Sequence, residues 1–352
     1  MKSKKLSEKI LSSIKSRGFK NITLDPVLET KYILQRSGEN FKKFLFSFYD
    51  LNGKELCLRP DLTISSAIRF VQNKKDNREK VFYSGEAFRK TYQKKDSIIK
   101  NQIGFEILAS KNNQKDDKEI IDTALKILKN SSFKKSILKI GNIELFNLLI
   151  KKLDIPIRWK NRLIRNHWNE SYFNELLKRL ETNSDIDPVF VETDKSKYKK
   201  MKKEDQNKII AGRTYKEVLN RFNMKITDPR KSSTGKKNTN IIKQFLKIKC
   251  PLEKAPKILN SFFKKNNINI IVGKDFFPLS KNNNKNIKIE FTASNGREVE
   301  LYSSMIFSIE VKIQSKFKNF ISGGRYDQLT SNLGFRKIPA VGAAVNMNLS
   351  CM

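Results

Sequence analysis

Side chains suited to binding a free amino acid are concentrated in four short segments of this sequence. A free amino acid carries an ammonium group, a carboxylate and a side chain, so its pocket needs a carboxylate, a guanidinium and a group that recognises the side chain. All three kinds are present, and the simpler alternative is that some of these polar residues only complete hydrogen bonds within a sheet. The segments are residues 58–63 (LRPDLT), 85–89 (GEAFR) with 102–106 (QIGFE), 297–304 (REVELYSS) and 323–327 (GGRYD).

Several other chemistries lack the residues they require. The chain has one histidine, His167, which excludes multi-histidine zinc sites and most histidine-based triads. Residues 235–237 (GKK) lack the spacing of a phosphate-binding loop, and no GxGxxG follows a predicted strand. Three widely separated cysteines form neither a disulfide framework nor a metal-ligand pair. We therefore predict no metal and no cofactor, and free thiols at Cys57, Cys250 and Cys351.

Local patterns in the first part of the chain alternate between helical and strand-like spacing. Apolar residues at helical spacing, a capping aspartate before a proline, and an Asn-Gly pair between alternating runs are the main signals. The predicted elements are a helix over 6–14 stopping at Gly18, a helix from Pro26 to about Gly38, strands over 44–49 and 55–58, a helix over 63–73, strands over 81–83 and 103–108, and a helix over 117–129.

The order of these elements predicts an α+β fold with an antiparallel sheet flanked by helices, not a doubly wound parallel sheet. We divide the chain into a first part of the core over 1–141, a mostly helical insertion over 142–286, and a last part of the core over 287–352. The last part contains strand-like runs over 288–292, 305–311 and 340–345, which should complete the first sheet. Within the insertion, residues 182–240 are polar and weakly periodic.

The four segments, taken in order, resemble the histidine branch of the class II aminoacyl-tRNA synthetases. LRPDLT is similar to the branch's LRPE-x-T signature, and GEAFR with QIGFE looks like class II motif 2. REVELYSS resembles the branch's RGLDYYTG segment, and residues 323–327 are identical to its GGRYD signature. Residues 340–342 (AVG) stand where motif 3 begins. The resemblance spans roughly residues 20 to 345 and implies a class II synthetase fold.

The resemblance also assigns roles to individual residues of a histidine pocket. It implies that the amino group of histidine is held by Asp61, Thr63 and Gln102, that its carboxylate pairs with Arg297, and that its imidazole is bound by Glu106 and Tyr302. Arg89 and Tyr326 would support the pocket from behind. Leu301 and Ser304 depart from the family's tyrosine and glycine, and Asp61 is one methylene shorter than the family's glutamate, which puts the pocket's shape in doubt.

The part of a synthetase that grips ATP is not recognisable in this sequence. After Arg89 the chain reads KTYQKKDSII, which lacks the further arginines that neutralise the adenylation transition state. Motif 3 is not followed by its arginine-bearing helix, and no anticodon-binding domain follows before Met352. Such a chain resembles the regulatory subunit of short-form ATP phosphoribosyltransferase. That family implies no catalysis by this chain, activation of a short catalytic subunit, feedback by L-histidine, and a homodimer within a hetero-oligomer.

Two other functions stay open from the sequence: a truncated histidyl-tRNA synthetase that still activates histidine, and an RNA-binding synthetase paralogue. The formal net charge of +36 suits RNA, but the lysines are spread along the whole chain and lack interleaved aromatic residues. We therefore expect a solvated lysine-rich surface and no specific nucleic-acid partner. No apolar run is long enough for a membrane span or a signal peptide, so we expect a cytoplasmic protein.

Overall fold

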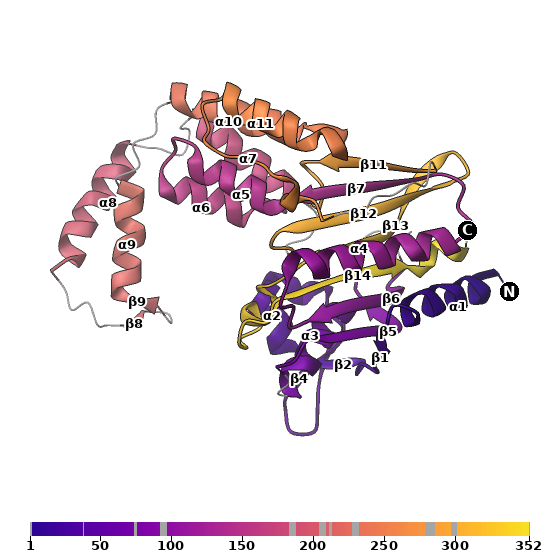
Figure 1. Cartoon of the computed structure of the whole chain (residues 1–352). Coiled ribbons are helices and arrows are strands. Elements are labelled where there is room, and N and C mark those ends of the chain that lie inside the picture. Colours follow the sequence, from indigo (N-terminus) through magenta and orange to yellow (C-terminus); the bar gives the residue numbers. More distant parts are fainter. Residues whose placement is uncertain are drawn as a thin grey trace.

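The structure, a computed structural model, is built around one large mixed sheet with helices on its faces and a helical extension at one end (Figure 1). It describes residues 2–37, 39–73, 76–91, 97–182, 188–203, 209–210, 213–226, 232–278, 286–296 and 301–351.

The large sheet has nine strands, and all neighbours are antiparallel except two parallel pairs, β1 with β5 and β7 with β11. This confirms the predicted α+β class with a mostly antiparallel sheet. In spatial order the strands are β1 (Lys20–Asn21), β5 (Glu79–Phe88), β6 (Ile99–Leu108), β14 (Ala340–Asn346), β13 (Lys316–Arg325), β12 (Met305–Ile313), β7 (Ser136–Asn142), β11 (Ile287–Thr292) and β10 (Lys249–Pro251).

Side chains alternate between the two faces of the large sheet along its central strands, and each face packs against an apolar cluster of its own. On β6 the side chains of Ile103, Phe105 and Ile107 are buried with the helices α1 (Lys2–Lys15) and α4 (Asn113–Asn130). The alternate residues of β6 face the opposite side, where the helix α3 (Leu62–Gln72) packs against β5 and β6. The face beside α3 is therefore the one on which the predicted site residues of β6 lie.

A second, three-stranded sheet holds the segment before α3. Its order is β2 (Val27–Glu29), β4 (Glu55–Leu58) and β3 (Ser47–Tyr49), all antiparallel. The predicted hairpin is confirmed, with Gly53 at a φ of +75° in its turn, but it belongs to this small sheet and not to the large one.

The predicted helix start at Pro26 is wrong. Residues 27–29 pair with β4 instead, and α2 begins at Thr30 and ends at Ser37. The backbone amide of Arg59 donates to the Pro26 carbonyl at 2.8 Å, and its guanidinium donates to the Leu24 carbonyl at 2.5 Å. These tertiary hydrogen bonds hold the segment extended, which overrides the local capping signal.

The helical region lies at the β7 and β11 end of the large sheet (Figure 1). β10 also falls within the predicted insertion and joins the sheet edge, so the boundaries at 142 and 286 stay a prediction. The remaining helices are α5 (Ile143–Lys152), α6 (Ile157–Arg165), α7 (Glu170–Thr182), α8 (Pro188–Met201), α9 (Tyr215–Ile226), α10 (Ser232–Leu246), α11 (Ala255–Lys265) and α12 (Leu329–Asn332). The short elements are β8 (Ile209–Ile210), β9 (Arg213–Thr214), and 3-10 turns over Glu39–Phe44, Leu252–Lys254, Lys274–Phe276 and Met347–Cys351.

None of the helices in the described part of the chain is both long enough and apolar enough to cross a membrane.

Candidate functional site

Glycines form the floor of the candidate site on the face of the large sheet beside α3. Gly342 of β14 lies directly opposite Glu106 of β6, and Gly324 of β13 lies opposite Gly342. A Cβ atom at Gly342 would come within 2.6 Å of the Glu106 Cγ, and one at Gly324 within 2.7 Å of the Tyr302 Cδ1. The missing side chains therefore let Glu106 and Tyr302 lie close against the sheet.

Glu106 is the buried acid of this floor. Only 1 % of it is exposed, and its Oε1 accepts a hydrogen bond of 2.7 Å from the Tyr83 hydroxyl. Burial raises the pKa of the Glu106 carboxyl to about 7, an effect that neighbouring hydroxyl groups only partly offset. Its second oxygen, Oε2, has no hydrogen-bond partner within the described residues. One oxygen of this buried carboxylate is thus available to a further hydrogen-bond donor.

Tyr326 brings a second buried polar atom to the same place. Its hydroxyl oxygen is also without a hydrogen-bond partner in the part of the chain that the structure describes. A Cβ atom at Gly342 would lie 3.2 Å from this hydroxyl. Burial, and then the negative charge of Glu106, raise the pKa of Tyr326 well above its ordinary value. The Glu106 carboxylate and the Tyr326 hydroxyl therefore interact with each other beside one glycine.

Asp61 and Thr63 stand at the start of α3, above the floor. Asp61 caps the helix, because its Oδ1 accepts from the amides of Thr63 at 2.8 Å and Ile64 at 3.2 Å. Its Oδ2 accepts from the Arg89 Nη2 at 3.2 Å, and Arg89 also donates to the Pro60 carbonyl at 2.7 Å. The cap and Arg89 therefore fix the Asp61 carboxylate.

Tyr83 joins these residues to Glu106, and the sequence reasoning missed it. Its hydroxyl lies 3.3 Å from the Thr63 Oγ1 and donates to Glu106. Tyr83 is paired with Gly104, which lies two residues before Glu106 on the same face of β6. A strand tyrosine opposite a glycine was a signal that could have identified it, because the ring needs the space that glycine leaves.

The other predicted residues are placed as follows. Gln102 is on the same face of β6, two residues before Gly104, and is partly exposed. Tyr302 lies against Gly324. Arg297 lies outside the described residues, so its predicted pairing with a carboxylate stays a prediction. The structure thus brings Asp61, Thr63, Glu106, Tyr326 and Arg89 together around Tyr83.

Gly104→Ala should displace Tyr83, because a Cβ atom there would lie 2.3 Å from the Tyr83 ring. We expect a loss of about 1 to 3 kcal/mol in the free energy of unfolding, measured by urea denaturation, from this overpacking. Ser84→Ala is the matched control. Ser84 follows Tyr83 in the sequence and is exposed, so this variant should change the free energy of unfolding by less than about 0.5 kcal/mol. Equal stabilities of the two variants would contradict the packing of Tyr83 on Gly104.

Arg325 of the GGRYD segment has a structural role beside the site. Its guanidinium donates to Asp117 at 2.8 Å, to Asp327 at 3.0 Å and to the Ser110 hydroxyl at 3.2 Å. Asp327 in turn accepts from the Ala340 amide at 3.1 Å, which ties the start of β14 to the cluster. The segment therefore fixes the backbone from which Tyr326 projects.

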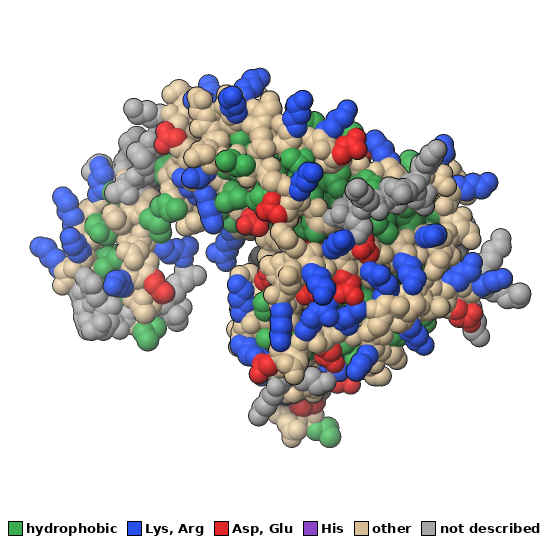
Figure 2. Space-filling model, in the orientation of Figure 1, with side chains coloured by type: hydrophobic (Ala, Val, Ile, Leu, Met, Phe, Trp, Pro, Cys, Tyr) green, Lys and Arg blue, Asp and Glu red, His purple; other side chains and the backbone are tan. Residues whose placement is uncertain are grey.

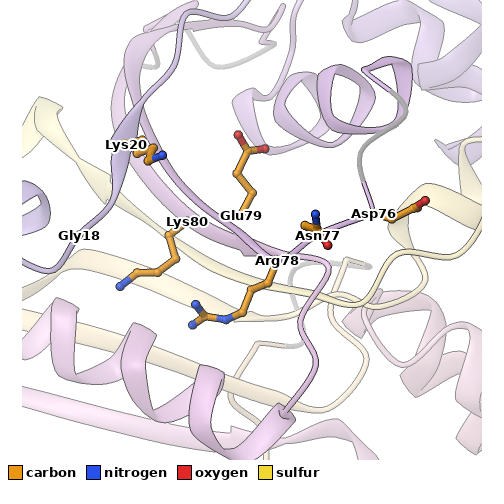
Figure 3. A pocket seen from close by; sticks show the side chains of 7 residues that line it. All are labelled: Gly18, Lys20, Asp76, Asn77, Arg78, Glu79 and Lys80. Carbon is orange, nitrogen blue, oxygen red and sulfur yellow. The ribbon is translucent and has the colours of Figure 1, made fainter.

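A surface cavity of about 700 Å³ lies elsewhere, beside the start of β5 (Figure 3). Its Arg78 donates to Asp116 and Glu119 at 2.7 Å each, and Lys80 pairs with Glu119. Because these cations are already satisfied, we do not assign this cavity a ligand. Among the residues described, no three or more His, Cys, Asp or Glu side chains are grouped to hold a metal ion.

A family model described as histidyl-tRNA synthetase matches residues 1–225 of the chain. The chain belongs to the histidyl-tRNA synthetase family. A protein from Allorhizobium ampelinum named ATP phosphoribosyltransferase regulatory subunit is 24 % identical to it, covering 95 % of this chain and 93 % of the relative. One of the same name from Sinorhizobium fredii is also 24 % identical, covering 90 % of this chain and 88 % of the relative.

Two solved structures share the fold of this member of the histidyl-tRNA synthetase family. An ATP phosphoribosyltransferase regulatory subunit/histidyl-tRNA synthetase from Bacillus halodurans has a TM-score of 0.58 at 16 % identity, covering 99 % of this chain and 78 % of that one. A histidine–tRNA ligase subunit from Alicyclobacillus acidocaldarius has a TM-score of 0.55 at 16 % identity, covering 99 % and 91 %. The predicted class II synthetase fold and the predicted family resemblance are confirmed.

Proposed function

We propose that this chain is the regulatory subunit of an ATP phosphoribosyltransferase, with L-histidine as its effector. One observation carries the histidine site: the Glu106 carboxylate and the Tyr326 hydroxyl are buried close to each other on a glycine floor, and neither the Glu106 Oε2 nor the Tyr326 hydroxyl forms a well-aligned hydrogen bond among the described residues. An imidazole N–H can donate to a carboxylate, and a phenol can accept or donate, so both groups suit the histidine side chain. The names of the relatives from A. ampelinum and S. fredii support the regulatory role.

In this proposal the catalysis belongs to a short-form catalytic subunit, and this chain is a homodimer within a hetero-oligomer. Histidine binds here and shifts the activity of the partner, which makes the effect a coupling free energy between two sites. A cytoplasmic location, as the sequence predicts, suits a step of amino-acid biosynthesis.

The hydrogen bonds of the Arg89 guanidinium favour this proposal over a working synthetase. Its guanidinium is engaged by Asp61 and the Pro60 carbonyl. The lysine-rich stretch that follows it offers no planar fork to replace a phosphate clamp. We expect no pyrophosphate exchange dependent on histidine and ATP, and exchange at a synthetase-like rate would contradict the regulatory role.

Calorimetry with L-histidine tests the effector site. We expect Arg297→Ala to weaken binding by about one to two decades, because a charge-assisted pair to a carboxylate contributes about 1.5 to 3 kcal/mol. Histidinol lacks the carboxylate, so it should bind the wild type as weakly as L-histidine binds Arg297→Ala. The affinity for histidinol should be the same in the wild type and in Arg297→Ala. If the wild type shows no binding of L-histidine, the pocket is not a histidine site and this part of the proposal is wrong.

A further inference from the structure

Glu106, the acid on the floor of the candidate site, has no basic partner among the described residues. Lysine and arginine side chains are scattered over the surface of the molecule (Figure 2), yet none that the structure describes forms an ion pair with Glu106. Its carboxyl is buried and is surrounded by hydroxyl groups. A buried carboxylate without a compensating cation is unfavourable, so burial raises the pKa of Glu106. A ligand that brings a positive charge would offset this cost.

Tyr83 occupies one oxygen of this carboxylate. Its hydroxyl donates to the Glu106 Oε1 at 2.7 Å, and only 2 % of the residue is exposed. The same hydroxyl lies 3.3 Å from the Thr63 Oγ1. A hydroxyl has one proton, so while Tyr83 donates to Glu106 it can only accept from Thr63. Oε2 is therefore the oxygen of Glu106 that remains for a ligand.

Ser66 places a second hydroxyl beside the carboxylate, and it belongs to none of the four sequence segments. It lies on α3 one turn after Thr63 and is fully buried where this helix packs against β6. Its hydroxyl lowers the pKa of Glu106, as a donor to an ionised carboxyl does, and has no other hydrogen-bond partner among the described residues. Tyr83 on β5 and Ser66 on α3 thus both favour the ionised form of Glu106.

The other charged and titratable groups around Glu106 do not provide a cation. Asp61, at the start of α3, adds a negative charge that raises the pKa of Glu106, and it is paired with Arg89. The segment after β13 contributes the Tyr326 phenol, with the phenol of Tyr302 nearby. β14 contributes only a glycine. The described surroundings of this carboxylate are therefore neutral or acidic.

The hydrogen-bond capacity of the pocket suits a ligand with two donors. Tyr326 interacts with Glu106 through its hydroxyl, so its single proton is directed to the carboxylate and its oxygen is left as an acceptor. The Glu106 Oε2 is an acceptor as well. A neutral imidazole has one N–H and one bare nitrogen, whereas an imidazolium has two N–H groups. Two acceptors and an uncompensated carboxylate both match the imidazolium.

We propose that the pocket binds histidine as the imidazolium with Glu106 as its counter-ion, and that Tyr83 and Ser66 are positioning residues that hold this carboxylate ionised. This assignment deepens the proposed function and rests on it. One ring N–H donates to the Glu106 Oε2 and the other to the Tyr326 hydroxyl, while Tyr83 keeps Oε1. The imidazole of free histidine is mostly neutral at pH 8, since its pKa is about 6.5, so binding at pH 8 takes up a proton from the solvent.

Nitrogen NMR tests the ionisation state directly, with L-histidine labelled with 15N in its ring and bound to the full chain at pH 8. The two nitrogens of an imidazolium have similar chemical shifts, whereas the bare and the protonated nitrogen of a neutral ring have widely separated shifts. We expect similar shifts in the complex and separated shifts for the free amino acid. Separated shifts in the complex would show a neutral bound ring and would overturn the proposal.

Calorimetry in two buffers with different enthalpies of ionisation counts the protons exchanged on binding. We expect an uptake of about one proton per histidine at pH 8. At pH 5.5 the sign should reverse, because histidine already carries its proton there and Glu106 must release one, in line with its pKa of about 7. Binding at pH 8 without proton uptake would mean that an ionised Glu106 holds a neutral ring, which contradicts the proposal.

Tyr83→Phe and Ser66→Ala test the two positioning residues, because each removes one hydroxyl and Tyr83→Phe keeps the aromatic ring. Each should weaken histidine binding at pH 8 by about three- to tenfold. Each should also move the acid limb of the affinity profile to higher pH, since Glu106 then holds its own proton more tightly. A merely structural effect would lower the affinity at every pH and leave this limb in place.

Ser65→Ala is the matched control for these variants. Ser65 is also buried on α3, but its hydroxyl donates to the Asp61 carbonyl at 3.2 Å and not to Glu106. Its removal should leave the affinity within about twofold and the acid limb unmoved. An acid limb that stays in place in Tyr83→Phe and Ser66→Ala as well would show that these hydroxyls do not hold the carboxylate ionised.

The outcomes separate this assignment from the function on which it rests. If L-histidine does not bind the wild type, the histidine site of the proposed function fails. If L-histidine binds with a neutral ring, the proposed function stands and the imidazolium is wrong. If it binds as the imidazolium and the variants follow the expected pH shift, both are supported.

Discussion

Replacing Glu106 by Gln should give a protein that is more stable than the wild type above pH 7 and that binds L-histidine at least about ten times more weakly. The binding loss follows because an amide accepts the imidazole N–H without the charge that strengthens the bond. The gain in stability follows because burial raises the pKa of Glu106 from 4.5 to about 7, and glutamine never ionises.

The sign of the pH effect follows from proton linkage. Between pH 4.5 and 7 the folded wild type holds a proton on Glu106 that the unfolded chain has released, so its stability falls as the pH rises through this range. The Gln variant lacks this fall. The free energy of unfolding of the Gln variant should exceed that of the wild type by close to zero at pH 4.5 and by roughly 3 kcal/mol at pH 8, measured by urea denaturation.

Other titrating groups cancel in this comparison. The pKa of Asp117 is likewise raised by burial, to about 6, but Asp117 is present in both proteins. A difference in stability that stays constant from pH 4.5 to 8 would show that Glu106 ionises at its ordinary pKa. Unchanged histidine affinity would remove Glu106 from the pocket.

Helices and strands whose apolar residues recur at a regular spacing could be predicted from the sequence. The first helix, the helix after Asp61, the pair of strands that became β5 and β6, and the helix over 117–129 are all present. β7 and β13 were not recognised. Glycines interrupt the apolar alternation of β13 at Gly323 and Gly324, and Gly324 is part of the floor of the site. The features that build the pocket are thus the ones that weaken the strand signal.

The candidate site was predictable where a motif named it and not where only packing defines it. Asp61, Thr63 and Glu106 came from the family motifs, and the structure connects them. Tyr83 belongs to no motif, because its role depends on facing Gly104 across the strand pair. The prediction that Asp61 holds an amino group stays a prediction, and the structure gives this carboxylate two further tasks, the cap of α3 and the support of Arg89.

Arg325 shows that a motif residue need not contact a ligand to be required. Only 1 % of it is exposed, and it holds Asp117 and Asp327 in one buried cluster. Asp117 is also buried, so without Arg325 its charge would have no compensating cation. Breaking a buried ion pair from one side is among the costliest single changes, because it strands the remaining charge.

Arg325→Ala should therefore lower the free energy of unfolding by about 3 to 5 kcal/mol at pH 8. The exposed pair of Arg336 with Asp76 is the matched control, and Arg336→Ala should cost no more than about 1 kcal/mol. Burial already raises the pKa of Asp117 to about 6, and loss of Arg325 raises it further, so protonation should relieve the penalty as the pH falls toward 5. Urea denaturation at pH 5 and pH 8 measures both effects. A loss equal to that of Arg336→Ala at both pH values would mean that Asp117 finds another partner and that Arg325 is not required for the fold.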